Sequence, residues 1–528
     1  MRRLTLFAAS FAFVAATPAL ADPVAIEVST APSIQGPQSG RILVFAHRVE
    51  PGAPAATEVD SSAFEPTGTA VAGREVQALT AGRPAIVDGE TDSFPTPFSQ
   101  LPPGTYRFQA VLDRNHDYNY GGRGAGDILS PVVEARLPGP VPRLVLGNIV
   151  PEPDLAASLA RQPEAAQAAY NRAIAVDFVS PRLSAFWGRP VHMRGWIMLP
   201  PGYRPNGARF PVVYTTGGFG SNLLTSRNVA AMAGLEMDAG HYPPMIWVSL
   251  DESSPTGTHE FADSANNGPW GAALTEELIP YLERTYRMDG RASGRFLTGH
   301  SSGGWATLWL QTRYPAIFGG TWSTSPDPSD FHDFTGIDLY APNANAYVAA
   351  DGSERPLVRD HGRVIATLRQ FAQLEAALGA YGGQFASFDW VFSPKGPDGR
   401  PLQIFDRNTG AVNPAVVPYW RDNYDIAHRL EQNWPRLRAL LDGKIHIIVG
   451  TADTFYLDGA AHRLDAVLHR LGARASITFL PDRTHFDLFQ QGNERFGMMR
   501  DITWAMYAVA RPGVRRPAAT VIVPATAH

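Results

Sequence analysis

The sequence predicts an α/β fold: a doubly wound, mostly parallel sheet that carries a cap insertion, preceded by a smaller all-β sandwich domain. After about residue 190, short apolar segments alternate with helical patterns, as in sheets that helices cover on both faces. Before about residue 153, helical periodicity is weak, and short segments of alternating polarity are separated by Pro- and Gly-rich turns. A stretch of about a hundred residues, 327–440, interrupts the second pattern and predicts the cap.

Length and composition exclude several classes of protein. A chain of 528 residues suits two or three folded parts, and 44% hydrophobic with 18% charged residues is typical of a globular protein. The formal net charge is -5, so there is no basic surplus for a phosphate backbone, and nucleic acid is not expected as a partner. The absence of cysteine excludes thiol catalysis, disulfides and thiolate metal sites.

Residues 1–21 have the pattern of an export signal. Arg2 and Arg3 precede an apolar run, and Ala19-Leu20-Ala21 provides a cleavage site of small residues. The apolar run is about 13 residues long, which is short of the roughly 20 needed to span a bilayer. We therefore expect a periplasmic or secreted protein that begins at Asp22 and has no transmembrane anchor after signal removal.

The part before the α/β region divides into two. Residues 22–153 are expected to form the β-sandwich, with strands such as 41–46 and 106–112 bounded by turns. Residues 154–188 are expected to form a linker with one helix, because the stretch from Ala156 to Ala175 is rich in alanine.

Residues 189–510 are expected to form the α/β domain, followed by a loose tail at 511–528. Its strands are short runs of three to seven residues, of which the first three are apolar, and amphipathic patterns such as Leu274, Leu278, Leu282 and Tyr286 predict the helices between them. The predicted strands are 193–199, 211–216, 245–250, 296–298, 321–324, 445–449 and 477–480; the predicted helices are 272–287, 302–314 and 459–471.

The cap contains an aromatic cluster with two interpretations. An insertion of this size needs its own apolar core, whereas aromatic walls also suit a bulky acyl group. The aromatic residues are Phe385, Phe388, Trp390, Phe392, Tyr419 and Trp420.

The segment Gly299-His300-Ser301-Ser302-Gly303 fits the pattern G-x-S-x-G, in which a serine nucleophile lies on a sharp turn. The pattern alone is weak in a Gly-rich chain, but here a predicted strand precedes it and a predicted helix follows it, which is the context that gives it meaning. We therefore predict that Ser301 is a nucleophile.

A serine hydroxyl needs a general base, and the base needs an acid that orients it. Two loops that follow predicted strands supply both: Asp453 comes after strand 445–449, and His485 comes after strand 477–480. Asp327 and Asp458 are rivals of Asp453 for the role of the acid.

The oxyanion of a tetrahedral intermediate needs preorganised N–H donors. One is expected to be the amide of Ser302, next to the nucleophile, and the other the amide of Phe219, in the Gly-rich loop after strand 211–216. The segment 258–270 also follows a strand and overhangs the same sheet edge, so its polar groups either contact substrate or cap turns and helices.

These motifs resemble the putative esterase family of the α/β-hydrolases, which includes feruloyl and acetylxylan esterases, enterobactin esterase, S-formylglutathione hydrolase and mycolyltransferases. The resemblance runs from about Arg189 to Tyr507, without most of the insertion. It implies an α/β-hydrolase fold with the triad order Ser301, Asp453, His485. The chain departs from many relatives in having Gly217-Gly218 where they carry His-Gly. The motifs carrying the resemblance are 199–203, 211–214, 299–303, 450–453 and 484–486.

One loop of the first domain places oxygen ligands at every second position, as calcium loops do. Its residues depart from an EF-hand, so a structural calcium ion is an alternative to an ordinary hydrogen-bonded hairpin loop. The candidate ligands are Asp113, Asn115, Asp117, Asn119 and Asp127.

The sequence thus predicts an exported serine esterase that requires no cofactor and acts on a small-molecule or polysaccharide-linked ester. Two alternatives stay open. The same triad would serve an acyltransferase, and a hydrolase scaffold would also serve a non-catalytic protein that binds a carbohydrate or a siderophore.

Overall fold

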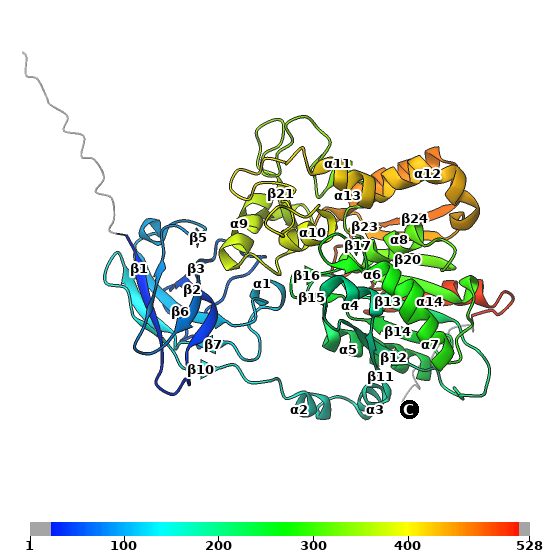
Figure 1. The fold of residues 1–528 in the computed structure, drawn as a ribbon, viewed down its shortest axis with the longest axis horizontal. Coiled ribbons are helices and arrows are strands. Elements are labelled where there is room, and N and C mark those ends of the chain that lie inside the picture. Colours follow the sequence, from blue (N-terminus) through cyan, green and yellow to red (C-terminus); the bar gives the residue numbers. More distant parts are fainter. Residues whose placement is uncertain (1–22, 517–528) are drawn as a thin grey trace, which may run out of the picture.

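The computed structural model describes residues 23–516. The predicted export signal at 1–21 and the distal part of the predicted tail lie outside the described residues. Figure 1 shows the N-terminal sheets in blue on one side of the molecule and the large mixed sheet with its helices on the other. Among residues 23–516, no helix combines the length and the apolarity that crossing a bilayer requires.

The N-terminal part holds ten strands in two sheets. A three-stranded sheet has the order β4-β1-β9, and a seven-stranded sheet has the order β10-β7-β6-β2-β3-β5 with β8 paired to β6. Buried side chains such as Ile26 and Phe108 fill the space between them. The elements are β1 (Ala25–Thr30), β2 (Gln38–Arg48), β3 (Thr69–Leu79), β4 (Ala85–Asp88), β5 (Ser93–Phe94), a 3-10 turn (Phe98–Gln100), β6 (Gly104–Asp113), α1 (Tyr118–Gly121), β7 (Ile128–Leu129), β8 (Val133–Leu137), β9 (Leu144–Leu146) and β10 (Asn148–Ile149).

The second part is built on an eight-stranded sheet with the order β11-β12-β14-β13-β19-β20-β23-β24. The pairs β11–β12 and β12–β14 are antiparallel, and the remaining pairs are parallel. The mostly parallel sheet was therefore predicted correctly. Its strands are β11 (Ile174–Val179), β12 (His192–Met198), β13 (Val212–Thr216), β14 (Ile246–Leu250), β19 (Arg295–His300), β20 (Gly320–Thr324), β23 (Ile445–Gly450) and β24 (Ala475–Leu480).

Helices cover both faces of this sheet, which explains why every residue of β13, β14 and β20 is buried. One apolar core includes Leu274, Trp305 and Leu464, and the core on the other side includes Ala230 and Met506. The covering helices are α5 (Leu223–Asp238), α6 (Trp270–Ala273), a π-helical turn (Leu274–Leu278), α7 (Ile279–Thr285), α8 (Ser302–Arg313), α12 (Ile426–Leu441), α13 (Leu457–Arg470) and α14 (Gly497–Ala510). Shorter elements are α4 (Pro181–Trp187), a 3-10 turn (Ala292–Gly294) and the hairpin strands β15 (Ser253–Ser254), β16 (Gly257–Thr258), β17 (Asp263–Ser264) and β18 (Gly268–Pro269).

The predicted linker at 154–188 needs a correction. It contains two helices, α2 (Leu155–Ala160) and α3 (Glu164–Arg172), and then β11, which is the edge strand of the large sheet. Only one of its six residues is buried, so β11 lacks the apolar run by which the inner strands were recognised. The large sheet therefore begins before residue 189.

The cap boundary also differs from the prediction at 327–440. The helix α12 packs against α8 and α13, so it belongs to the cover of the large sheet. The other elements of the insertion are a 3-10 turn (Phe331–Asp333), β21 (Pro356–Asp360), β22 (Arg363–Thr367), α9 (Leu368–Leu378), α10 (Gln384–Phe392) and α11 (Val417–Tyr424).

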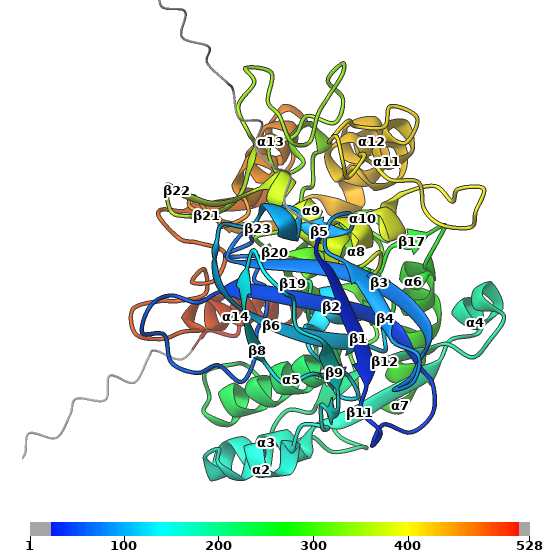
Figure 2. The same ribbon diagram turned by 90° about the vertical axis from the view of Figure 1, so that its left-hand side faces the viewer.

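The helix α9 joins the cap to the N-terminal sheets. Figures 1 and 2 both place it beside β3 and β5, and it contacts both strands. Leu374, Ala377 and Leu378 of α9 share an apolar cluster with Phe45 and Val71 of the seven-stranded sheet. The cap therefore covers a face of this sheet that would otherwise expose apolar side chains.

Candidate active site

Ser301 lies on a sharp turn between β19 and α8. Its backbone has φ 60° and ψ -125°, a conformation that L-residues rarely adopt. Its N–H donates to the carbonyl of Thr324, and its carbonyl accepts from the N–H of Trp305. Such strain persists only where surrounding contacts fix it, and it commonly marks a functional site.

Two glycines allow the turn at Ser301 to close. A Cβ at Gly299 would lie 2.2 Å from the carbonyl oxygen of Gly303, and one at Gly303 would lie 2.1 Å from that of Gly217. Neither contact leaves room for a side chain, so the pattern G-x-S-x-G is required here for steric reasons.

His485 and Asp453 form a buried pair at the same sheet edge. Their side chains are 4% and 0% exposed, and Nδ1 of His485 lies 2.9 Å from Oδ2 of Asp453. Burial tends to raise the pKa of Asp453, but the His485 ring and the N–H of Phe455 outweigh this and hold the pKa below its ordinary value. Asp453 therefore stays ionised and can orient His485.

Ser301 itself has a different acid as its side-chain partner. The Oγ of Ser301 lies 3.5 Å from Oδ1 of Asp327, and the hydroxyl of Ser302 donates to Oδ2 of Asp327 at 2.6 Å. In residues 23–516, no hydrogen bond joins Ser301 to His485; in ligand-free sites such bonds are often long. Of the two rivals of Asp453, Asp327 thus contacts both serines, whereas Asp458 pairs with Arg359 at 2.8 Å.

The loop after β13 lies directly against Ser301. An added Cβ on Gly218 would be 2.9 Å from Cβ of Ser301, so the backbone of residues 217–220 passes next to Ser301. The amide of Phe219 directly follows Gly218, and the amide of Ser302 directly follows Ser301, so both expected donors are adjacent in sequence to this close contact.

All of these residues follow carboxyl ends of neighbouring strands. The strands β13, β19, β20, β23 and β24 end at one edge of the sheet. The pairing of their last residues shows this: Thr216 pairs with Gly299, His300 with Thr324, and Gly450 with Leu480. Ligands in open α/β sheets bind at this edge. The loops that carry Ser301, Asp453 and His485 were predicted to follow these strands, and the structure has them there.

Two further glutamates have buried carboxylate oxygens without hydrogen-bond partners, within electrostatic range of Asp327. Glu252 and Glu260 are 1% and 0% exposed. Burial raises the pKa of both well above the ordinary value, and the charge of Asp327 adds to this. Burial also raises the pKa of Asp327 to about 6. Glu260 belongs to the segment 258–270, in which Asp263 accepts from the N–H of Ala272 and Asn266 donates to the carbonyl of Ser393 in the cap.

The cap and the N-terminal part both contact residues of this site. Arg359 of the cap donates to the carbonyl of Asp453 at 2.8 Å. Tyr120 of the N-terminal part packs its ring edge-on against Phe219 at 4.9 Å and donates to the carbonyl of Ser221 at 2.5 Å. Tyr120 also borders a cavity of about 920 Å³ between the N-terminal part, the cap and the large sheet. No sequence pattern marks Arg359 or Tyr120.

The aromatic residues of the cap mostly form its core. Phe385, Phe388, Phe392 and Trp420 are at most 3% exposed and pack on one another, while Trp390 borders the 920 Å³ cavity. These four residues therefore agree with the interpretation that the insertion has its own core.

The loop that carries the candidate calcium ligands is closed by hydrogen bonds. The carboxylates of Asp113 and Asp127 accept backbone N–H groups of their own loop, and the amide of Asn119 donates to the carbonyls of Glu375 and Gly379 in the cap. In the described part of the chain, no group of three or more Asp, Glu or His side chains is arranged to hold a metal ion. Asn115 and Asp117 belong to this same hydrogen-bonded loop.

Comparison with known proteins places the chain among esterases. Esterase Rv1288 of Mycobacterium tuberculosis (strain H37Rv) is 27% identical over 161 residues, which cover 29% of this chain and 34% of that protein. Esterase MT1326 of Mycobacterium tuberculosis (strain CDC 1551) matches to the same extent. The match thus spans about a third of the length of these curated relatives.

Solved structures that match this chain include a ferulic acid esterase, with a TM-score of 0.40 and 12% identity, and the S-formylglutathione hydrolase of Staphylococcus aureus, with a TM-score of 0.37 and 12% identity. Each match covers 64% of this chain and 98% of the other. The model of the family described as "Putative esterase" matches residues 190–470, which is more than half of the chain. The chain belongs to the putative esterase family.

Proposed function

We propose that the protein is an exported serine carboxylic-ester hydrolase that works through an acyl-enzyme. Ser301 attacks the ester carbonyl, His485 takes the proton of the hydroxyl and returns it to the leaving alcohol, and Asp453 orients His485. The amides of Phe219 and Ser302 stabilise the oxyanion. The substrate is a small-molecule or polysaccharide-linked ester, and the reaction requires no cofactor.

One observation carries this proposal. The strained turn at Ser301 and the buried His485–Asp453 pair, joined at 2.9 Å, lie at the same edge of one sheet. Storing backbone strain and burying an ionised carboxylate both cost stability, and a scaffold that only binds ligand needs neither. This disfavours a non-catalytic carbohydrate- or siderophore-binding protein.

The test is the hydrolysis of p-nitrophenyl esters from acetate to decanoate by the mature protein and by Ser301→Ala. We expect kcat/KM to fall by several powers of ten in Ser301→Ala. Ser158→Ala, on the exposed face of α2, is the matched control and should behave as the wild type. A fluorophosphonate probe should label Ser301 in the wild type. Equal activity in the wild type and Ser301→Ala would refute the proposal.

An acyltransferase remains the second candidate, because the acyl-enzyme can react with a hydroxyl other than water. Product analysis in the presence of an added alcohol distinguishes the two: transfer gives a new ester, and hydrolysis gives the free acid. For export, sequencing of the mature N-terminus in a periplasmic or culture fraction should find Asp22.

A further inference from the structure

Three phenylalanines from distant parts of the chain meet beside His485. Phe64 lies in the loop between β2 and β3, Phe455 follows Asp453, and Phe486 follows His485. The ring centroids are 6.3 Å apart for Phe64 and Phe455, 5.8 Å for Phe64 and Phe486, and 5.9 Å for Phe455 and Phe486. We call these three residues the aromatic triplet.

The aromatic triplet is open to solvent although it is apolar. Phe64 is 49% exposed and Phe486 is 64% exposed, which is the largest exposure of any large hydrophobic residue in the described chain. Scattered apolar side chains on a surface need no explanation, but several that cluster at a functional site indicate a binding surface.

Two rings of the aromatic triplet pack against the imidazole of His485. The centroids of Phe455 and Phe486 lie 5.0 Å and 5.4 Å from that of His485, and both rings are nearly perpendicular to it. His300, at 4.3 Å, also packs on His485. Because Phe486 is exposed and His485 is buried, the triplet forms the outer surface next to the imidazole.

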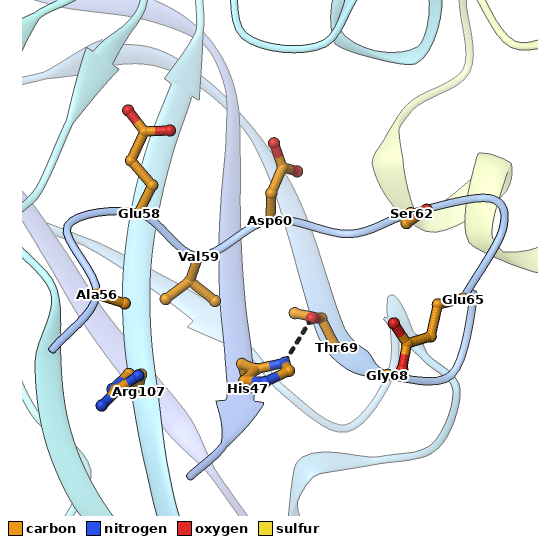
Figure 3. Close-up of a pocket in the computed structure, with 10 residues that line it drawn as sticks. All are labelled: His47, Ala56, Glu58, Val59, Asp60, Ser62, Glu65, Gly68, Thr69 and Arg107. Carbon is orange, nitrogen blue, oxygen red and sulfur yellow. Dashed lines mark hydrogen bonds between the residues drawn. The ribbon is translucent and has the colours of Figure 1, made fainter. Parts of the chain in front are cut away.

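The loop that carries Phe64 is fixed to the N-terminal sheets. Val59 is buried and donates its N–H to Oε1 of Gln109 at 2.8 Å, and Arg123 lies 3.5 Å from Asp60. Figure 3 shows this loop, with Val59 and Asp60, around a cavity of about 280 Å³. The N–H of Phe64 donates to Oγ of Ser62 at 3.1 Å. A ring held in this way loses little conformational freedom when it binds a ligand.

The chemistry of acylation defines which part of an ester lies beside His485. The Oγ of Ser301 forms a bond to the acyl carbon, and the bond between that carbon and the alcohol oxygen breaks. The proton that His485 took from Ser301 passes to this leaving oxygen. The alcohol must therefore leave next to the imidazole, while the carbonyl oxygen faces the amides of Phe219 and Ser302.

We propose that the aromatic triplet is the subsite for the leaving alcohol and selects alcohols that carry a flat, apolar ring. This inference rests on the proposed function. Aromatic rings attract one another when their centroids are about 4.5 to 7 Å apart. Because the three rings of the triplet are inclined to one another, the ring of a substrate alcohol can contact them face to edge in several orientations. Phe64 thereby makes the N-terminal part a contributor to substrate selection.

The experiment compares kcat/KM for benzyl acetate and ethyl acetate, which share the acyl group and have leaving alcohols of similar acidity. We expect the wild type to prefer benzyl acetate, and Phe64→Ala and Phe486→Ala each to reduce this preference by up to about tenfold. Phe64→Leu, which keeps apolar volume, should lose less of the preference than Phe64→Ala. Phe496→Ala, at an exposed ring outside the triplet, is the matched control.

A second pair of substrates, ethyl acetate and ethyl phenylacetate, varies the acyl group. If the phenylalanine variants change this ratio and leave the benzyl preference intact, the triplet holds the acyl group and the proposal is wrong. An unchanged benzyl preference in an active enzyme also overturns the proposal, but not the proposed function. A folded wild type without Ser301-dependent hydrolysis of any ester overturns both.

Discussion

Asp327→Asn is expected to stabilise the protein in a pH-dependent manner. Asp327 is 5% exposed, and burial raises its pKa from 3.8 to about 6 in the folded protein. In the unfolded chain the pKa is that of a free aspartate, so the folded state binds the proton more tightly than the unfolded state. The stability that the protonated form provides is fully present below pH 3.8 and is lost as the pH rises through about 6.

The size of this loss follows from the two pKa values. A pKa difference of one corresponds to about 1.4 kcal/mol, so the change from 3.8 to about 6 corresponds to about 3 kcal/mol. Asparagine does not titrate but can still accept the hydrogen bond from Ser302. Its effect on the free energy of unfolding should therefore be about 2 kcal/mol more favourable at pH 8 than at pH 4, which is less than the full difference because pH 4 lies above the pKa of the unfolded aspartate. Any cost of the substitution that is independent of pH cancels in this difference.

Urea denaturation followed by tryptophan fluorescence measures the effect. All eleven tryptophans lie at residue 187 or beyond, so their fluorescence reports on the part of the chain that contains Asp327. The control is Asp351→Asn. Asp351 is exposed, and the hydroxyl and amide of Ser353 lower its pKa. The effect of this substitution on the free energy of unfolding should not become more favourable at high pH. If Asp327→Asn changes the stability equally at pH 4 and pH 8, Asp327 is not a destabilising buried charge and the reasoning fails.

Three more substitutions test the geometry of the site. Asp453→Asn should lower kcat by about 10⁴-fold with little change in KM, measured with p-nitrophenyl acetate; a loss below tenfold would exclude Asp453 as the acid. Gly303→Ala should abolish activity or soluble expression, because its Cβ would lie 2.1 Å from the oxygen of Gly217, and near-native activity would contradict the close packing of the turn. Tyr120→Phe removes the hydrogen bond to Ser221 but keeps the ring; we expect kcat to fall about fivefold at unchanged thermal stability, and an unaltered kcat would show that this bond does not position the loop of residues 217–220.

The sequence was sufficient to predict the inner strands and the loops that follow them. The strands β13 and β14 consist mostly of apolar residues because both faces are buried, and this leaves a strong signal in a single sequence. The strand β20 is equally buried, but its residues are mostly small or polar. The turn at Ser301 was recognised because its steric demands allow only glycine at 299 and 303. Local physical constraints of this kind can be read without the rest of the fold.

The edge strand β11 and the role of Asp327 could not be predicted with the same certainty. β11 is mostly exposed, so its residues resemble a linker. Asp327 was recognised only as a rival acid, because its contact with Ser301 and Ser302 depends on the path of the chain after β20. Likewise, the partnerless Glu252 and Glu260 look like ordinary surface acids until their burial is known.

The contacts of the N-terminal part have no sequence signature either, yet they bear on what this part does. Arg41 donates to the carbonyl of Ala377 at 2.7 Å, and Phe45 and Val71 share an apolar cluster with α9 of the cap. A detachable binding module would present a polar surface to its neighbour, since interfaces between independent domains are more polar than a core. An apolar face closed by the cap instead favours a part that braces the cap. Because the cap in turn holds the carbonyl of Asp453 through Arg359, the N-terminal sheets are linked through the cap to the proposed acid from outside the large sheet.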